Sequence, residues 1–263
     1  MTWLTSLPAV VLVAGGLVLA LLATLGGRLA VRALVPATER DTAYTIAAPL
    51  MPALGALFAL FMGLTLASEA SFLASAQGIV SNEAADASRL AWAATSAGVN
   101  SAPIQSALLG YLQATRGNEW HGNNAANGDD PATAHALANL EDAVRTQAAR
   151  SALGTPTSSE LLSSLDALTN DRRARLAAAS HVLPVLYVVV LALSAAALLA
   201  NATALTVRSG RRATVLIGGL VVVIGLSMAL LFALGTPWRG SITVSGQPID
   251  AVVHDLNAGY FQR

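Results

Sequence analysis

Four long stretches without a single Asp, Glu, Lys or Arg constrain this chain more than any other feature of its sequence. They cover residues 1–27, 42–68, 176–207 and 213–238. A helix needs about 20 apolar residues to cross the hydrocarbon core of a bilayer, and each stretch meets that length. Only 11% of the 263 residues are charged, against about 25% in a typical soluble domain. The sequence therefore predicts a multi-pass membrane protein.

The first stretch reads as a retained helix rather than a cleaved signal peptide. No basic residue precedes its apolar core, as a signal peptide would require. Arg28 and Arg32 follow it instead, which is typical of a helix whose C-terminal end faces the cytoplasm. We therefore expect four transmembrane helices, with the first at residues 7–27.

The region between the second and third stretches is different, with eleven acidic residues and seven Arg over residues 69–175. We predict an all-α membrane protein in four parts. Transmembrane helices one and two with a short Arg-containing loop occupy 1–68, and an extramembrane helical bundle occupies 69–175. Transmembrane helices three and four occupy 176–238, and a C-terminal tail occupies 239–263.

Helix signals divide the extramembrane region. Nothing between residues 68 and 97 stops the helix of span two from continuing, and Pro103 opens the next helix. Asp130 followed by Pro131 is typical of an N-cap and first helical position. A fourth helix is expected to begin near Ser158 and to run into span three. Apolar residues recur at helical spacing along these segments and need a partner surface, which favours a bundle.

The tail and the span ends give further expectations. The tail reads as an extended piece, a turn at 246–248 and a short helix from residue 250 that packs on the bundle. Trp3 and Trp238 stand at the outer edges of spans one and four, and Tyr44 stands on the opposite side. This pattern fits aromatic residues at the two membrane surfaces.

Arginine counts in the short loops predict the orientation. The loops between spans one and two and between spans three and four hold six Arg, against four on the other side. An excess of basic residues marks the cytoplasmic side. The count therefore favours a bundle and termini outside the cytoplasm.

The sequence offers no convergent catalytic or metal-binding set. It has no Cys, no phosphate-binding Gly loop and no nucleophilic serine elbow. Glu119, His121, Asp129 and Asp130 share one loop, but a Gly/Asn-rich loop in solvent commonly holds such residues, and we predict no metal. The formal net charge is zero, so no basic excess indicates nucleic acid as a partner. We expect no enzyme and no cofactor.

The absence of charge within the spans bears on transport. An ionisable residue inside the membrane is the usual mark of a proton relay or ion-coupled carrier. A passive pore needs none, because apolar constrictions can gate ions by dewetting. The sequence therefore argues against a pump and leaves a channel open.

Span two carries a face of small residues at every fourth position: Gly55, Ala59, Gly63 and Ala67. Such faces permit close contact between helices in membranes. In one interpretation the helix packs against copies of itself and turns larger apolar residues toward a constriction. In the other, the face packs within one chain and the phenylalanines face lipid.

Four stretches of the sequence follow one another in a recognisable order: Glu69 with SNEAADASRL after span two, GYLQATRGNEW at 110–120, DRRARLAAASHVLPVLYVVV at 171–190, and GTPWRGSITVSGQPI at 235–249. Together they resemble the bestrophin-like domain family of bacterial membrane proteins. The resemblance covers most of the chain from residue 45 onward.

Bestrophins proper are pentameric anion channels with four spans per subunit, in which the second span lines the pore. The resemblance implies self-association in the inner membrane of a bacterium, with the lipid bilayer and chloride or another small anion as partners. It places the bundle in the cytoplasm, opposite to the arginine count. It implies pore candidates Leu54, Phe58, Phe61, Met62 and Thr65, and residues that line or brace the pore approach, Glu69, Glu83, Arg172, Arg173 and Arg175.

A function from another class stays open. The bundle of residues 69–175 would bind a ligand or partner and pass a helix displacement into spans two and three. Helices that cross the membrane boundary without a break favour this membrane-anchored sensor or interaction module, which would have neither transport nor catalytic activity.

Overall fold

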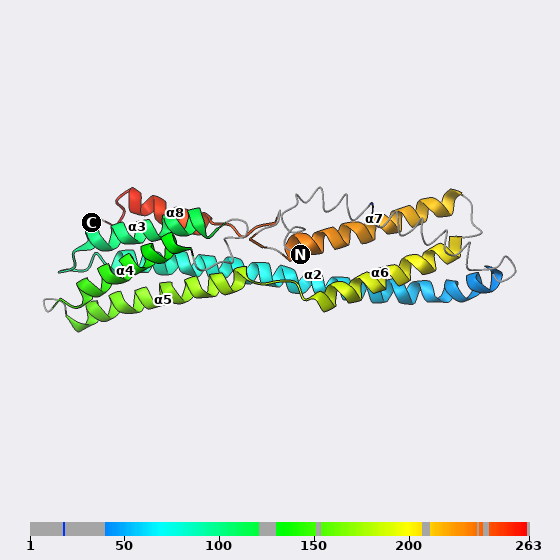
Figure 1. Cartoon of the computed structure of the whole chain (residues 1–263), viewed down its shortest axis with the longest axis horizontal. Helices are drawn as coiled ribbons and strands as arrows, with labels where there is room; N and C mark the ends of the chain where they lie inside the picture. Colours follow the sequence, from blue (N-terminus) through cyan, green and yellow to red (C-terminus); the bar gives the residue numbers. More distant parts are fainter. Residues whose placement is uncertain are drawn as a thin grey trace. The chain divides into compact units, whose positions relative to one another are not determined.

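The computed structural model of the chain describes residues 18, 40–120, 130–150, 154–206, 211–235, 237–238 and 242–261. Within these ranges every regular element is an α-helix (Figure 1). The predicted all-α fold is therefore confirmed for the described residues. They divide into two compact units, which share the long helix α2 (Arg40–Ala93).

The first unit holds the membrane-spanning helices. It contains residues 40–71 of α2, together with α6 (Val185–Thr206) and α7 (Arg211–Leu234). Stretches of all three helices are long and apolar enough to cross a membrane: Tyr44–Ala93, Val185–Leu205 and Ile217–Leu234. Three of the four predicted spans are thus present as helices. The first, at residues 7–27, lies outside the described residues.

Apolar side chains from the three helices form the core of this unit. Phe58 and Met62 of α2 belong to one buried cluster with Leu191 and Leu198 of α6 and Val221 of α7. Each helix contributes one side to this cluster and leaves the rest of its apolar surface exposed. Exposed apolar surface of that extent suits a lipid environment rather than water.

A side-chain amide adds a polar contact to this apolar unit. Asn201 of α6 donates a hydrogen bond of 2.9 Å to the carbonyl of Ala47 in α2. Pro49 and Pro52 lie inside the same part of α2, and each proline removes one donor from the helix. Membrane helices tolerate proline where neighbouring helices supply polar contacts. Asn201 makes such a contact beside the two prolines.

The expectation that the fourth bundle helix runs unbroken into span three was wrong. Helix α5 (Thr155–Ala179) ends before Ser180, and α6 begins only at Val185. Pro184 explains the break, since it has no N–H to continue α5 and disfavours helical backbone at the residue before it. The carbonyl of Pro184 instead accepts from the N–H of Tyr187 at the start of α6.

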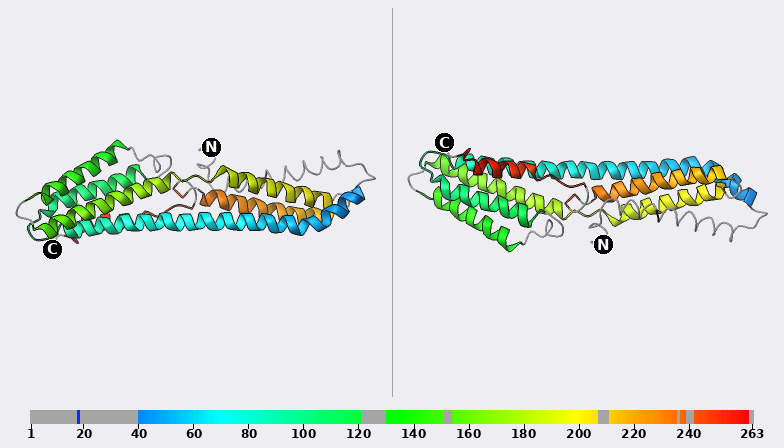
Figure 2. Two further views of the ribbon diagram at one scale, coloured as in Figure 1. Left: turned by 90° about the horizontal axis from the view of Figure 1, so that it is seen from below. Right: turned by 90° about the horizontal axis from the view of Figure 1, so that it is seen from above.

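The second unit is the helical bundle. It contains residues 72–93 of α2 with α3 (Ser101–Asn118), α4 (Pro131–Ala148), α5 and α8 (Gln247–Asn257) (Figure 2). Helix α2 ends before Gly98, whose φ of 87° is a backbone conformation that glycine adopts readily. Asp130 caps α4 as predicted, because its side chain accepts from the N–H of Thr133 and Pro131 follows it.

Two helix starts differ from the expected ones. Helix α5 begins at Thr155 rather than near Ser158, and α8 begins at Gln247 rather than at Asp250. In both cases a proline stands in the first turn, where its missing N–H costs nothing. In both helices a glycine, Gly154 or Gly246, stands just before the first helical residue, and a proline, Pro156 or Pro248, follows two residues later.

The tail packs on the bundle as predicted. Ile249, Val252 and Leu256 of α8 are buried in the bundle core, and α8 contacts α3. Trp238 was expected at a membrane surface, but its side chain is buried in this same core. The helix of span four ends at Leu234, so Trp238 lies in the segment that leads back to the bundle.

Candidate functional site

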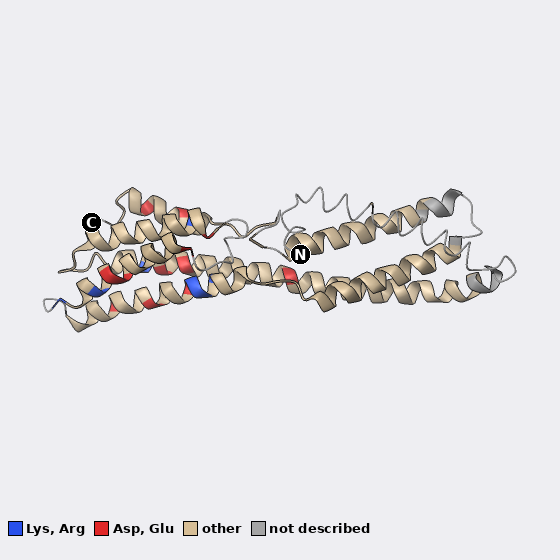
Figure 3. Cartoon of the chain, in the orientation of Figure 1, with Lys and Arg blue, Asp and Glu red and all other residues tan. Residues whose placement is uncertain are grey.

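Among the residues coloured in Figure 3, the charged ones are concentrated on the helices of the bundle, and few lie on the described part of the first-unit helices. Some of these bundle charges are buried. On α2, the residues at helical spacing that face the bundle core include Ala76, Val80, Ala87 and Leu90. Glu83 occupies the same stripe and is 0% exposed.

Helix α5 brings two arginines to the core by the same periodicity. Leu161, Leu165 and Leu168 form its buried stripe, and Arg172 and Arg175 continue that stripe at the next two turns. Arg173 falls on the exposed side, where its guanidinium lies 3.4 Å from the Asn170 side-chain oxygen. Only two of the three arginines in the run are therefore buried.

Helix α3 supplies the remaining members of the group. Tyr111 and Thr115 lie on its buried face with Ile104 and Leu108. Glu119 follows one turn after Thr115, at the C-cap of the helix, and is 0% exposed. Three helices therefore bring acidic, basic and phenolic groups to one buried place.

The contacts among these groups join them in one continuous series. The Nε of Arg175 lies 2.6 Å from Oε2 of Glu83, and its Nη2 lies 3.0 Å from Oε2 of Glu119. Arg172 donates to the other oxygen of Glu119. The Tyr111 hydroxyl donates to Oε1 of Glu83 at 2.7 Å. We call these five residues the Glu83–Arg175 network.

The network has two carboxylates and two guanidinium groups, so its formal charges cancel. Burial raises the pKa of Tyr111 well above its ordinary value, and the negative charge of Glu83 raises it further. Burial opposes the charged form of Arg175, but Glu83, Tyr111 and Glu119 outweigh it and raise the pKa of this guanidinium. Both groups therefore keep their protons at every physiological pH.

Trp120 links the network to the tail. Its ring lies 5.8 Å from the Cζ of Arg175 and 4.6 Å from the Cζ of Arg116, within reach of cation–π attraction. Arg116 forms a two-pronged ion pair with Asp250 of α8, at 2.7 and 2.9 Å. A side chain at Gly246 would overlap the Arg116 guanidinium. The start of α8 is therefore fixed by Arg116.

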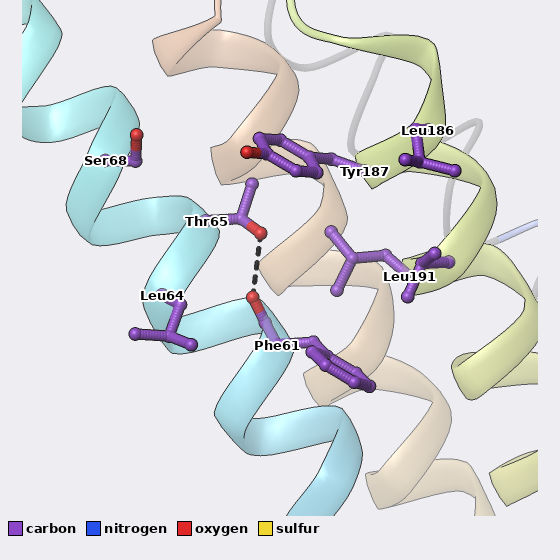
Figure 4. A pocket seen from close by; sticks show the side chains of 8 residues that line it. Phe61, Leu64, Thr65, Ser68, Leu186, Tyr187 and Leu191 are labelled. Carbon is purple, nitrogen blue, oxygen red and sulfur yellow. Dashed lines mark hydrogen bonds between the residues drawn. The ribbon is translucent and has the colours of Figure 1, made fainter.

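A pocket of about 320 Å³ lies in the first unit between α2 and α6 (Figure 4). Phe61, Leu64, Thr65 and Ser68 line it from α2, and Leu186, Tyr187, Val190 and Leu191 line it from α6. The Thr65 hydroxyl donates a hydrogen bond of 2.8 Å to the carbonyl of Phe61, so its proton is already bonded within its own helix. The lining is mainly apolar, with three hydroxyl groups.

The pore candidates fall on two sides of α2. Phe58 and Met62 are buried against α6 and α7, and Thr65 is also buried. Leu54 is half-buried against the same cluster. Phe61, at 36% exposed, is the candidate with the most accessible side chain. Phe61 and Thr65 are the two candidates that line the pocket.

The small-residue face of α2 has no partner surface near its glycines in the described part of the chain. A side chain added at Gly55 or Gly63 would meet nothing within 4 Å. Ala59 and Ala67 are exposed. The described helices of the first unit therefore do not occupy this face closely.

The predicted approach residues have different surroundings. Glu83, Arg172 and Arg175 meet in the buried network, where they hold helices together and do not form an open surface. Arg173 is exposed, and Glu69 is buried and belongs to the first unit. The buried members thus fit bracing rather than lining.

Two acidic residues of the loop at 119–130, Glu119 and Asp130, are described, and each has a structural role. Glu119 forms ion pairs with two arginines, and Asp130 caps α4. Hydrogen bonds from Thr133 and Asn118 lower the pKa of Asp130. His121 and Asp129 lie outside the described residues. Among the residues that are described, no group of three or more His, Asp or Glu is arranged to hold a metal ion.

The sequence analysis did not predict that Tyr111, Glu119 and Trp120 belong to one site. The signal was nevertheless present, because all three belong to the stretch GYLQATRGNEW that carries the family resemblance. The partners Glu83, Arg172 and Arg175 belong to two other stretches of that resemblance. These separated stretches therefore meet in one buried network.

Comparison with known proteins identifies a family match that includes these stretches. No curated protein and no solved structure matches the chain. The family model described as "Bestrophin-like domain" matches residues 18–249, which is most of the chain. The protein is a membrane protein that belongs to the bestrophin-like domain family.

Proposed function

We propose that the protein is a homo-oligomeric passive anion channel of a bacterial inner membrane, with four spans per subunit and α2 at the pore. Family membership and the charge-free spans support this function. The observation that carries it is the small-residue face of α2, beside whose glycines the described residues leave open space. A second copy of α2 would fill that space.

In this proposal Phe61 is the constriction residue. Its ring is accessible and stands on the helix that also carries Gly63. Phe58 and Met62 would support the helix from inside the subunit, since they pack on α6 and α7. Thr65 and Leu54 would border the constriction on either side. Chloride or a similar anion would pass an apolar ring that opens by wetting.

The subunit count tests the assembly. Native mass spectrometry of the protein in detergent should give a pentamer. A monomer or dimer would exclude a pore shared among copies of α2. Gly63→Leu should weaken the assembly, because a large side chain would block close helix contact. The matched control is Gly218→Leu, since Gly218 also has no neighbour within 4 Å but lies on α7.

Anion flux into liposomes tests the pore. Phe61→Ala should raise flux by widening an apolar constriction. Leu193→Ala, at an exposed position of α6, should leave flux as in the unmodified protein. Equal flux in all three proteins would exclude Phe61 from the pore.

A membrane-anchored sensor without transport or catalysis is the second candidate function. The continuity of α2 favours it, because one helix contains both the apolar stretch and the bundle residues Glu83 and Leu90. A ligand that moves the bundle end of α2 would thereby act on the same helix in the membrane. Pentameric protein without anion flux, but with ligand-dependent stabilisation of the bundle, would favour this function.

A further inference from the structure

The pocket between α2 and α6 lies where the side chains of α2 become small. Phe58 and Met62 are large, and both pack into the buried apolar cluster of the first unit. One turn further along α2, toward the part of this helix that belongs to the bundle, the residues that line the pocket include Thr65 and then Ser68. These short side chains leave the space between the two helices unfilled.

The pocket has a closed floor and an open side. Thr65 and Leu191 are buried and form the floor. Leu64 and Leu186 also line the pocket, but they are 62% and 68% exposed and stand at its open side. Both helices are long and apolar enough to cross a membrane, so the open side faces lipid chains.

Two polar groups of the lining gather at one end of the pocket. Ser68 is the last residue of the charge-free stretch 42–68, and Tyr187 is the third residue of α6. Both therefore stand where their helices reach the membrane surface. Figure 4 shows the Tyr187 ring extending from α6 toward α2. Phe61 and Leu191 lie one to two turns deeper along their helices, so the other end of the pocket is apolar.

The polar end offers hydrogen bonds but no charge. The Ser68 and Tyr187 hydroxyls make no hydrogen bond to any described residue, and a hydroxyl both donates and accepts. The described lining contains no charged side chain. An ionised head group would therefore lack a counter-charge in the pocket, whereas an uncharged hydroxyl would find two partners.

The dimensions of the pocket suit one short chain. Its volume of about 320 Å³ is at the lower end of the range for ligand pockets, which favours a single chain over a two-chain lipid. The seven residues from Phe61 to Ser68 cover about 10 Å along the helix. A fully extended chain covers about 1.2 Å per bond, so this length takes roughly eight bonds.

We propose that this pocket binds a single-chain, uncharged amphiphile, with its hydroxyl head at Ser68 and Tyr187 and its chain reaching Phe61. The head makes hydrogen bonds that the chains of bulk lipid do not make. A chain that fills the pocket leaves the Phe61 ring no room there and holds the ring in the constriction. That regulatory effect rests on the proposed channel function; the binding does not.

Photolabelling of the full chain in liposomes tests the site, with decanol that carries a diazirine near its chain end as the probe. Labelling should saturate, should be competed by unmodified decanol, and should map to the pocket residues of α2 and α6. Val190→Trp should abolish most of the saturable labelling by filling the pocket. The matched control is Val189→Trp, at an exposed position outside the lining, which should keep it. Labelling that does not saturate and spreads over all lipid-facing residues would overturn the proposal, because bulk chains alone would then fill the pocket.

A photoreactive hydrocarbon of the same length tests the hydroxyl head. At equal mole fractions in the bilayer, the unmodified protein should bind the alcohol about fivefold more tightly, as a small number of hydrogen bonds would give. Ser68→Ala with Tyr187→Phe should lose this preference and still bind both probes, which a damaged fold would not do. Ser194→Ala, on α6 but outside the lining, should keep the preference. Equal binding of the two probes by the unmodified protein would overturn the proposal.

A thiol at the polar end tests whether protein already covers the pocket. The chain has no Cys, so Ser68→Cys introduces a single thiol. Decanol should slow its reaction with a maleimide, and the exposed control Ser75→Cys on α2 should react at the same rate with and without decanol. A Ser68→Cys thiol that is protected without decanol would show that span one or a second copy of the chain fills the pocket, and would overturn the proposal.

Anion flux tests the regulatory effect separately. Decanol should lower flux through the unmodified protein and should have no such effect on Val190→Trp. An equal response of the two proteins would overturn the regulatory effect. Labelling and thiol protection do not depend on flux, so saturable labelling in a protein without flux would exclude the channel function and leave the binding site in place.

Discussion

Arg175 and Glu83 are both 0% exposed, and they join α5 to α2 through an ion pair of 2.6 Å between residues 92 positions apart in the sequence. A buried pair of this kind gains little over a well-packed apolar pair, because both charges lose their water. Its loss on one side only is costly, since the remaining charge stays buried. The pair therefore selects one arrangement of the bundle helices more than it adds to their stability.

Glu83→Gln should destabilise the bundle by about 3 kcal/mol or more, because it leaves the Arg175 charge without its closest partner. The double variant Glu83→Leu with Arg175→Met should lose less than the single variant, since no uncompensated charge remains. Thermal or denaturant unfolding in detergent measures both. The matched control is Arg89→Gln, which breaks an exposed ion pair with Glu160 and should have a much smaller effect on stability.

Tyr111→Phe should cost about 1–3 kcal/mol, because it removes a buried hydrogen bond to a charged acceptor. It should also leave the alkaline absorbance titration of the folded protein nearly unchanged. Burial and Glu83 raise the pKa of Tyr111 well above its ordinary value, so this phenol does not ionise before the protein unfolds. A lost titration step near pH 10 in this variant would contradict the buried assignment.

Gly246→Ala should destabilise the start of α8 by about 1 kcal/mol or less, because the Arg116 guanidinium must move aside and give up a partly exposed ion pair with Asp250. In an Arg116→Ala background the same change should cost less, since neither the overlap nor the ion pair with Asp250 is present. The control is Gly110→Ala in α3, where the methyl group has open space and should stabilise the helix slightly. Proteolysis of the tail and melting temperature report both effects.

Asn201→Leu should weaken the membrane unit by about 0.5–2 kcal/mol, because it removes the hydrogen bond to the Ala47 carbonyl. The matched control is Ser194→Ala on the same helix, since the Ser194 hydroxyl bonds only to Val190 of its own helix. Unfolding from mixed detergent micelles compares the two variants. Equal losses would show that the contact between α6 and α2 adds nothing beyond a local helix bond.

Much of the fold was predictable from helical periodicity and from residues that begin or end helices. The buried stripe of α5 runs from Leu161 to Leu168 at helical spacing, and the same spacing assigns Arg172 and Arg175 to the core and Arg173 to the surface. The cap at Asp130 was likewise predictable, because Asp is favoured at the N-cap of a helix and Pro at its first position.

Other features depend on contacts that no local pattern encodes. Glu119 stands at the C-cap of α3, and nothing in the local sequence indicates that its two arginine partners, more than 50 residues away, lie beside it. In α2 nearly every residue between 50 and 67 is apolar or small, so the contrast that distinguishes a buried face from a lipid face is absent. That is why the sequence could not separate buried Phe58 from accessible Phe61.

Helix α8 has a consequence for how the protein is made. Residues 249–261 complete the core of a bundle whose other helices are encoded before residue 180. Two apolar membrane helices, α6 and α7, leave the ribosome between these parts. The bundle core therefore stays open while its own chain is being inserted, and it closes only after the last membrane helix has been synthesised.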